Sequence, residues 1–230
     1  TAMAAMLAHE VKNPLSGIRG AAQLLEDTVS EDDQSLARLI RDEVDRIVEL
    51  VDRMGMFAGD APIRHQSVNI HQILDRALQV SKIGFGRHSR FVTRFDPSLP
   101  PVRGNHDQLV QVFLNLIKNA VEAASDEAAE IVMETSYQNG VRLAAPGNGE
   151  RVHLPLTISI TDNGTGIPDD MMPHLFDPFV TSKAQGSGLG LALVAKIIGD
   201  HGGIVECETA NTRTIFRVML PMSQDREGFE

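Results

Sequence analysis

Cysteine, long apolar runs and basic residues are all scarce in this sequence. A single cysteine, Cys207, cannot form a disulfide within the chain of 230 residues, and an unpaired thiol suits a reducing compartment. There is no signal peptide and no apolar run of about 18 residues, the length that a membrane-spanning helix needs. These absences predict a cytoplasmic location and no membrane segment. Because the sequence begins at Thr1, we expect it to be a fragment of a longer chain.

The shortage of basic residues leaves a strongly acidic chain. Its 21 Lys and Arg residues face 31 Asp and Glu residues, for a net charge of −10. This balance disfavours a general nucleic-acid surface. Residues 1–60 alone hold 6 basic and 12 acidic residues, so the acidity is densest there. The length allows one large domain or two modest ones.

Residues 1–57 read as a helical hairpin. Apolar residues of its second half step by 4, 4, 3, 4 and 3, which is close to a heptad seam: Leu36, Ile40, Val44, Ile47, Val51 and Met54. The polar stretch 28–33 joins the two helices. Because two helices cannot bury a whole apolar stripe, we expect a homodimer in which two hairpins form a four-helix bundle. Docking of the hairpin on the rest of its own chain is the alternative.

Residues 58–66 have the composition of a linker, and after them the sequence changes from long helical patterns to mixed shorter segments. Residues 67–222 mix helices and strands, which predicts an α+β sandwich with helices on one face of a mixed sheet. We expect helices near 69–82, 107–124 and 189–201, and strands near 91–95, 131–138, 156–161, 204–208 and 214–220. The stretch 140–152 suggests a hairpin excursion, and residues 223–230 form a tail.

The first reactive cluster is His9-Glu-Val-Lys-Asn-Pro14. Asn13 lies four residues after His9, on the same helix face, and Glu10 is its neighbour. Pro14 cannot bond to the carbonyl of Glu10, so the helix should bend there. An exposed imidazole beside a carboxylate can attack a phosphoryl group. A surface histidine without a reactive role is the competing interpretation, and no second ligand at suitable spacing supports a metal site.

A second cluster begins on the helix near 107–124. Gln108, Gln111, Asn115, Asn119 and Glu122 follow its polar face. Asparagine is a poor helix former, so two asparagines at i and i+4 suggest a role in holding Mg²⁺ together with phosphates. A plain solvent-facing surface remains possible from this helix alone.

Two glycine-containing segments follow. Asp162 ends an alternating strand and precedes Asn163-Gly-Thr-Gly-Ile-Pro168, where it can accept a hydrogen bond from an exocyclic amine. Thr181-Ser-Lys-Ala-Gln-Gly-Ser-Gly-Leu-Gly190 leads directly into a helix, so its free N–H groups, with Lys183, form an anion site suited to phosphates. A plain turn is the alternative for the first segment.

Two common phosphate motifs do not fit this glycine-rich loop. A Walker A loop ends in Gly-Lys-Ser/Thr, whereas this loop ends in Gly190-Leu-Ala. A dinucleotide fingerprint needs glycine at position 191, which is Leu, and a strand before the loop, where residues 181–185 give none.

These motifs together resemble the sensor histidine kinases of two-component systems. The motifs are His9-Glu-x-x-Asn-Pro, Asn115-x-x-x-Asn119-Ala, Asp162-x-Gly-x-Gly-Ile, Phe176-Asp-Pro-Phe179 and Gly186-x-Gly-x-Gly190, in that order. The resemblance is strongest to the nitrogen-regulation branch and covers a kinase core without its sensor domain. It implies a dimerisation and phosphoacceptor domain over 1–57 and an ATP-binding domain of the Bergerat type over 67–222.

The resemblance also implies roles for individual residues. His9 would be phosphorylated, with Glu10 as its acid/base partner, and Asn13 would position water when the phosphorylated regulator is dephosphorylated. The implied ATP site comprises Asn115, Lys118, Asn119, Asp162, Gly164, Gly166, Ile167, Phe179, Thr181, Lys183, Gly186, Gly188, Leu189, Gly190 and Thr214. Within it, Asn119 and Asn115 would hold Mg²⁺, Asp162 would read adenine, and residues 176–179 and 181–185 would form a lid.

The implied activity is ATP-dependent autophosphorylation followed by transfer to an aspartate of an NtrC-like response regulator, with phosphatase activity toward that regulator. A PII-type regulator is a further implied partner. Related ATP-driven clamps carry Glu where this chain has Asn115, and an amide cannot take a proton from water. That departure argues against a clamp. A non-catalytic, dimeric nucleotide-binding scaffold is the other alternative.

Overall fold

The computed structural model describes residues 2–58, 64–124, 129–138, 142–144, 151–183, 186–210 and 213–223. The chain divides into two compact units, Thr1–Pro62 and Ile63–Glu230, and each is considered by itself. No helix among these described residues is long and apolar enough to cross a membrane.

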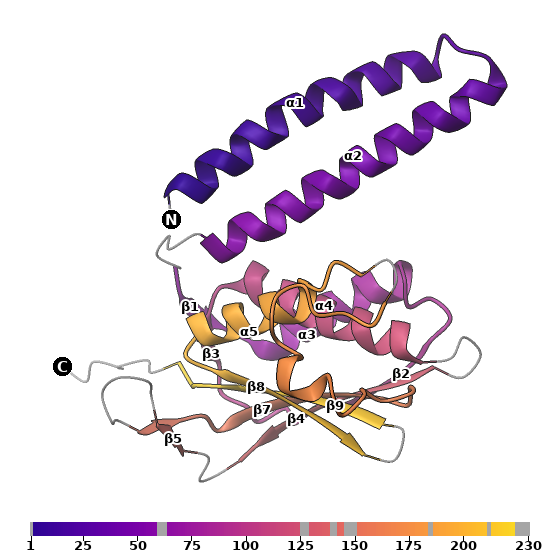
Figure 1. Ribbon diagram of the computed structural model, residues 1–230. Coiled ribbons are helices and arrows are strands. Elements are labelled where there is room, and N and C mark those ends of the chain that lie inside the picture. Colours follow the sequence, from indigo (N-terminus) through magenta and orange to yellow (C-terminus); the bar gives the residue numbers. More distant parts are fainter. Residues whose placement is uncertain are drawn as a thin grey trace. The chain divides into compact units, whose positions relative to one another are not determined.

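The first unit is a hairpin of two helices, α1 (Ala2–Glu26) and α2 (Glu31–Ala58), which run antiparallel (Figure 1). The connection between them is closed by local bonds. The Thr28 hydroxyl donates to the Leu24 carbonyl over 3.0 Å, and the Ser30 hydroxyl donates to the Asp33 carboxylate over 2.8 Å. Short polar residues that bond to nearby main chain and side chains end one helix and start the next. The predicted helical hairpin is therefore confirmed.

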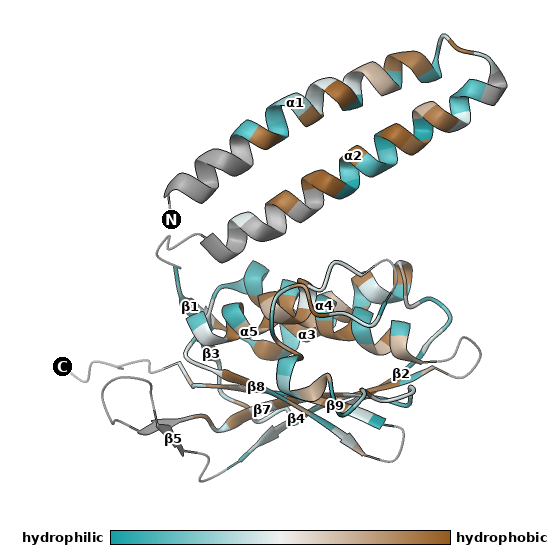
Figure 2. Ribbon diagram, in the orientation of Figure 1, coloured by the Kyte–Doolittle hydropathy of each residue, from teal (hydrophilic) through white to brown (hydrophobic). Residues whose placement is uncertain are grey.

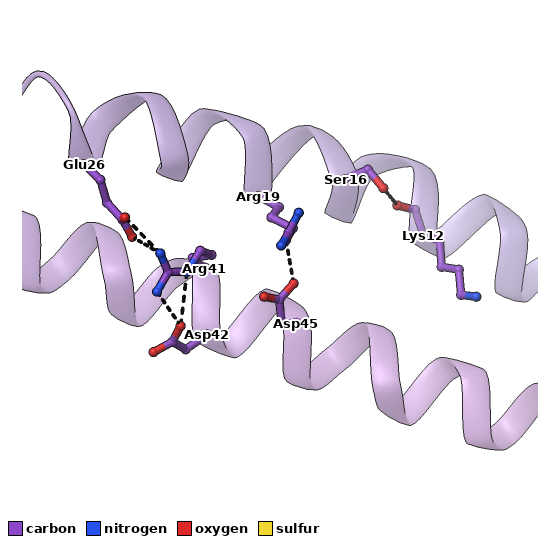
Figure 3. Close-up of polar contacts among 7 residues, drawn as sticks. All are labelled: Lys12, Ser16, Arg19, Glu26, Arg41, Asp42 and Asp45. Atoms are coloured by element: carbon purple, nitrogen blue, oxygen red, sulfur yellow. Dashed lines mark hydrogen bonds and ion pairs between the residues drawn. The ribbon is translucent and has the colours of Figure 1, made fainter.

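Small and medium apolar residues pack α1 against α2. The buried positions are Leu15 and Ala22 on α1 and Ala37 and Val44 on α2. Alanine at two of these four positions permits a close approach of the helices. Charged pairs flank this seam, as Figure 3 shows: Arg19 Nε lies 2.7 Å from an Asp45 carboxylate oxygen, and Arg41 bonds to both Glu26 and Asp42 at 2.9 and 3.1 Å.

The seam uses only part of the apolar surface of the hairpin. The exposed large apolar side chains are Val11, Ile18, Leu24, Leu25, Leu36, Leu39, Ile40 and Ile47. Three residues of the predicted heptad seam, Leu36, Ile40 and Ile47, are therefore not covered by the partner helix of the same hairpin. Only Val44 of that seam is buried among the positions whose burial is described.

The second unit is built on a five-stranded sheet in the order β2-β4-β7-β9-β8. The strands are β2 (Arg90–Arg94), β4 (Glu130–Tyr137), β7 (Leu156–Asp162), β8 (Ile204–Ala210) and β9 (Arg213–Leu220). Strands β2 and β4 are parallel, and the other neighbours are antiparallel. The mixed sheet predicted from the order of elements is confirmed.

Three helices cover one face of this sheet (Figure 1): α3 (Ile70–Ile83), α4 (His106–Ala123) and α5 (Gly190–Asp200). The layer between them is strongly hydrophobic (Figure 2) and includes completely buried Phe113, Leu116 and Ile158. Asn105 caps α4, because its Oδ1 accepts from the Asp107 and Gln108 amides at 3.1 Å. The α/β sandwich with helices on one face is confirmed.

Shorter elements complete the unit. Strands β1 (Gln66–Val68) and β3 (Val102–Gly104) pair antiparallel and were not expected from the sequence. Strands β5 (Arg142–Ala144) and β6 (Arg151–His153) form an antiparallel pair that begins within the predicted excursion at 140–152 and ends one residue after it. A single 3₁₀ turn, η1 (Met172–His174), precedes the glycine-rich loop. Most of the linker prediction (59–63) and of the tail prediction (224–230) lies outside the described residues.

Candidate functional site

The polar face of α4 carries the first part of the site. Asn115 Nδ2 donates to the Gln111 carbonyl over 2.9 Å, which fixes the orientation of its amide. Asn119 Oδ1 lies 3.4 Å from Nζ of Lys183, a residue of the distant loop. The same ammonium forms an ion pair with Glu122, whose carboxylate also lies 3.8 Å from Lys118 Nζ. The structure thus brings together predicted residues of two separate segments and adds Glu122 to them.

Asp162 ends β7 and is only 2% exposed. Its register neighbour on β9 is Thr214, which is equally buried. Burial raises the pKa of the Asp162 carboxyl, while the Gly164 amide, the Lys183 charge and the Thr214 backbone act in the opposite direction. The Gly164 amide donates to Asp162 Oδ1 over 2.9 Å. A buried carboxylate with one oriented oxygen, at the end of the central strand, is suited to accepting a hydrogen bond from a ligand.

The turn after Asp162 requires glycine at position 164 because there is no room for a side chain. A Cβ added at Gly164 would lie 2.4 Å from the Ala123 carbonyl oxygen, which accepts from the Thr165 amide at 3.3 Å. The turn is therefore packed on the last residue of α4 and fixes Asp162 relative to that helix. Gly166 has φ +79°, a conformation that L side chains rarely adopt. Ile167 follows it and is half-buried.

The glycine-rich loop is closed at its base by two left-handed residues. Phe179, with φ 68°, donates its amide to the carbonyl of Gly188, with φ 65°, over 2.9 Å. The Phe179 side chain is exposed. Between them, Thr181 Oγ1 accepts from the Lys183 amide at 3.1 Å, and the exposed Gly186 donates to the Lys183 carbonyl at 3.0 Å. The predicted lid residues 184 and 185 lie outside the described residues.

Helix α5 begins directly after this loop. Its N-cap residue, Leu189, is buried and supplies no side-chain hydrogen bond to the first turn. Amides of an uncapped first turn can bind an anion, and the helix dipole favours negative charge there. A Cβ at Gly190 would lie 3.1 Å from Asn115 Oδ1, so the start of α5 is adjacent to the Asn115 amide. The loop, α4 and α5 therefore meet at one place.

The residues before Gly186 form turns and bends rather than a strand: residues 175–183 contain no regular element. A dinucleotide fingerprint needs a strand that enters its glycine loop. The structure therefore contradicts the dinucleotide interpretation.

Two residues of β8 lie toward the same end of the sheet as Asp162 and were not expected from the sequence as part of the site. Thr209 pairs in register with Thr214, and its Cγ2 lies 2.9 Å from a Cβ built on Gly166. Cys207 is half-buried, and burial with the nearby Asp162 and Glu208 charges raises the pKa of its thiol to about 12. Only the pairing of β8 with β9 reveals their position, because no local pattern marks these residues.

The phosphoacceptor candidate lies in the other unit. His9 is within α1, which continues through Pro14, and its side chain is outside the described side chains. Glu10 and Asn13 are exposed. Asn13 lies one helical turn from His9, and positions i and i+4 share a helix face. Ser16 Oγ donates to the Lys12 carbonyl over 2.9 Å in the turn that contains Pro14.

The oxygen donors of the site suit a magnesium ion that keeps phosphate and water ligands. Among the described residues, no three His, Cys, Asp or Glu side chains are grouped as a metal site. Asn119 Oδ1, however, faces a cation, the ammonium of Lys183, as does the neighbouring Glu122 carboxylate. Mg²⁺ is commonly bound by one or two protein oxygens and completed by substrate phosphates. The residues present therefore fit Mg²⁺ in company with a nucleotide.

Comparison with known families matches two parts of the chain. Residues 104–224 match the family described as histidine kinase-, DNA gyrase B-, and HSP90-like ATPase, and residues 1–58 match the His Kinase A (phospho-acceptor) domain. The chain therefore belongs to the sensor histidine kinase family. Membership of the ATPase family implies that it binds ATP.

Among curated proteins, the chain resembles sensory histidine kinase/phosphatase NtrB from several bacteria. It is 60% identical over 227 residues to the Azospirillum brasilense protein, which covers 99% of this chain and 57% of that protein. It is 36% identical over 219 residues to the Escherichia coli O157:H7 protein, which covers 94% and 60%. The chain thus spans less than two thirds of the length of these relatives.

Solved structures give the same fold. Full-length ShkA in complex with AMPPNP has a TM-score of 0.75 and 27% identity, covering 95% of this chain and 45% of that one. The mycobacterial sensor histidine kinase MprB has a TM-score of 0.56 and 24% identity, covering 69% and 97%, and supports the fold alone.

Proposed function

We propose that this chain is the kinase core of an NtrB-like sensory histidine kinase/phosphatase in nitrogen two-component signalling. It transfers the γ-phosphoryl group of ATP to His9 and then to an aspartate of an NtrC-like response regulator. The observation that carries the proposal is the meeting of Asn119, Lys183 and the uncapped start of α5 beside the buried Asp162. Residues 1–57 accept the phosphoryl group, residues 67–222 bind ATP, and residues 58–66 act as the hinge between them.

In this proposal, different residues of the site bind the adenine, the phosphates and the metal ion. Asp162 accepts a hydrogen bond from the adenine amine, in a pocket shaped by Gly164, Gly166 and Thr214. The phosphates bind the amides of Gly186–Gly190 and the ammonium of Lys183. Asn119 and Asn115 would hold Mg²⁺ through their amide oxygens, and this ion would neutralise charge on the phosphates.

The transfer step needs an accessible, neutral imidazole. A ring nitrogen of His9, Nε2 by our assignment, attacks the γ-phosphorus while the bond to the β,γ-bridging oxygen breaks and ADP leaves. Glu10, exposed one residue away, accepts the proton that the ring loses. Catalysis rests on positioning and on charge neutralisation, because the phosphoryl group needs little covalent help from the protein.

Transfer is favoured over hydrolysis because the side chain beside the start of α5, where the phosphates bind, is an amide, and the nearby Glu122 carboxylate is paired with the Lys183 ammonium. The side chain nearest Gly190 is the Asn115 amide, whose Nδ2 is committed to the Gln111 carbonyl. Its oxygen can accept a hydrogen bond but cannot remove a proton from water. This feature supports a phosphotransferase over an ATP-driven clamp.

Two further proposals concern the helical hairpin. Asn13, exposed one turn after His9, positions water for dephosphorylation of the regulator. The apolar residues left uncovered by the hairpin, including Leu36, Ile40 and Ile47, support a homodimeric four-helix bundle. Sedimentation at micromolar concentration should then give the dimer mass, and a monomer alone would reject it. The PII-type partner and cytoplasmic location stay predictions from the resemblance.

Incubation with γ-labelled ATP and Mg²⁺ tests the central proposal. The label should remain on the protein in an acid-labile, alkali-stable bond and disappear in His9→Gln. His88→Gln, an equal change at an exposed histidine of the other unit, should label normally. Addition of an NtrC receiver domain should then remove the label from the wild-type chain. Label that persists in His9→Gln would reject the assignment of His9.

The same assay separates the proposed activities. Asn13→Ala should autophosphorylate normally and fail to dephosphorylate the phosphorylated receiver, and normal dephosphorylation would remove Asn13 from the mechanism. ATP binding without any label on the wild-type chain would instead favour the non-catalytic scaffold.

A further inference from the structure

Glu122 is a described carboxylate at the nucleotide site to which the proposed mechanism gives no task. It lies on α4 one turn after Asn119, and its carboxylate forms an ion pair with Lys183 of the glycine-rich loop. The two side chains are 61 residues apart in sequence and are 37% and 39% exposed. The contact therefore tethers the loop to the helix that carries the candidate metal ligands.

The ion pair with Glu122 holds the Lys183 ammonium next to a candidate metal ligand. Its ammonium is 3.4 Å from Asn119 Oδ1, the oxygen that the proposed function assigns to Mg²⁺. A cation bound at that oxygen would repel the ammonium and compete with it for the same lone pairs. Lys183 must therefore leave Asn119 when a metal–nucleotide complex binds.

We propose that Glu122 is a positioning residue that anchors Lys183 over Asn119, so that binding of Mg²⁺ and ATP exchanges the partners of Lys183. In this exchange the ammonium moves from Glu122 and Asn119 to the phosphate oxygens, and Asn119 Oδ1 becomes available to the metal. The loop bonds on both sides of Lys183 move with it, because its amide binds Thr181 Oγ1 and its carbonyl accepts from Gly186. This inference rests on the proposed function for its metal step only.

Amide hydrogen exchange of the whole chain without nucleotide tests the tether. Glu122→Gln should speed exchange at amides of the loop, Phe179 and Lys183 among them, by about 2- to 5-fold, the range for losing an exposed ion pair. Lys183→Met should do the same, and the double variant should add nothing further. Glu134→Gln is the matched control, because it breaks the ion pair to Arg94, 2.9 Å long, on the other sheet face. Unchanged exchange in Glu122→Gln, or additive effects in the double variant, would overturn the tether.

ATP titration calorimetry in EDTA and in Mg²⁺ tests the exchange of partners. In EDTA, Glu122→Gln should bind ATP about 3- to 10-fold more tightly, because Lys183 is released and one repelling charge is gone. The gain should shrink in the Lys183→Met background, where only the lost repulsion remains. The affinity for ATP in Mg²⁺ divided by the affinity in EDTA should therefore be smaller in Glu122→Gln than in the wild-type chain. A merely structural role of Glu122 would not lower this ratio.

If Glu122→Gln raised ATP affinity equally in the wild-type and the Lys183→Met backgrounds, the proposal that Glu122 acts through Lys183 would be refuted. A wild-type chain that binds no ATP in either buffer would count against the proposed function, and the exchange experiment would still decide on the tether.

Discussion

The crowded glycine after Asp162 gives a prediction whose size follows from the structure. In Gly164→Ala the new methyl carbon would lie 2.4 Å from the Ala123 carbonyl oxygen, 2.6 Å from its carbon and 2.8 Å from Asp162 Oδ1. Two of these atoms are backbone at the end of α4, so no flexible side chain can give way. Either the turn or the end of the helix must shift.

The cost should resemble overpacking of a core, about 1 to 3 kcal/mol. For a unit the size of Ile63–Glu230 this corresponds to a fall in melting temperature of about 2 to 12 °C. ATP affinity should fall as well, because the Gly164 amide fixes Asp162 Oδ1. A misaligned hydrogen bond to this carboxylate should weaken binding by about 10- to 100-fold.

Gly199→Ala is the matched control. Gly199 lies in α5, and a Cβ there meets nothing within 4 Å. The same substitution should therefore stabilise by about 0.5 to 1 kcal/mol at most and leave ATP binding unchanged. Calorimetric melting of the whole chain and ATP titration supply both measurements. A Gly164→Ala variant as stable as Gly199→Ala, with wild-type affinity, would show that the turn does not fix Asp162.

Two further predictions concern buried titratable groups. Asp162→Asn should lower ATP affinity about 10- to 100-fold, yet urea unfolding at pH 7.5 should show unchanged or raised stability. The raised pKa means that ionising this carboxyl costs stability as pH rises, and a clear loss of stability would contradict this reasoning. His201 has its pKa lowered by burial, donates Nδ1–H to the Ile197 carbonyl and accepts from the Asn105 amide, so the unfolded chain takes up the proton first. Stability should therefore fall as pH drops below 6.5, and His201→Gln should flatten that dependence between pH 7.5 and 5.5; an unchanged slope would assign it to other groups.

Long periodic segments were predictable from the sequence almost to the residue. The helix expected at 107–124 is His106–Ala123, and the strand expected at 131–138 is Glu130–Tyr137. Both bury one face, as the strand does with Ile131, Met133 and Thr135, and a buried face is what gives a pattern its period. The pair β1 and β3 was missed because a strand of three residues shows a single alternation. The two strands are also far apart in the sequence, since Ser67 of β1 is opposite Arg103 of β3.

Residues of the site were predictable where their type conflicts with local structure. Two asparagines inside α4 and the glycines around residues 186–190 stand out for that reason. Glu122 and Thr209 do not stand out, because glutamate suits a helix and threonine suits a strand. Their positions depend on contacts across the fold, Glu122 with Lys183 and Thr209 with Thr214, which no local pattern contains.

Several such conflicts lie together near the end of the central strand β7. Asp162 is buried with a raised pKa, and Phe179, which is not a glycine, has a positive φ. Each feature destabilises the fold relative to an ordinary residue at the same place. Elsewhere in this unit the layer between the helices and the sheet is mostly apolar and includes completely buried Phe113 and Ile158, with His201 as a buried exception. A concentration of unfavourable residues at a single site is expected where binding, and not stability, has determined the residues. It follows that substitutions which relieve them should stabilise the chain and weaken ATP binding together.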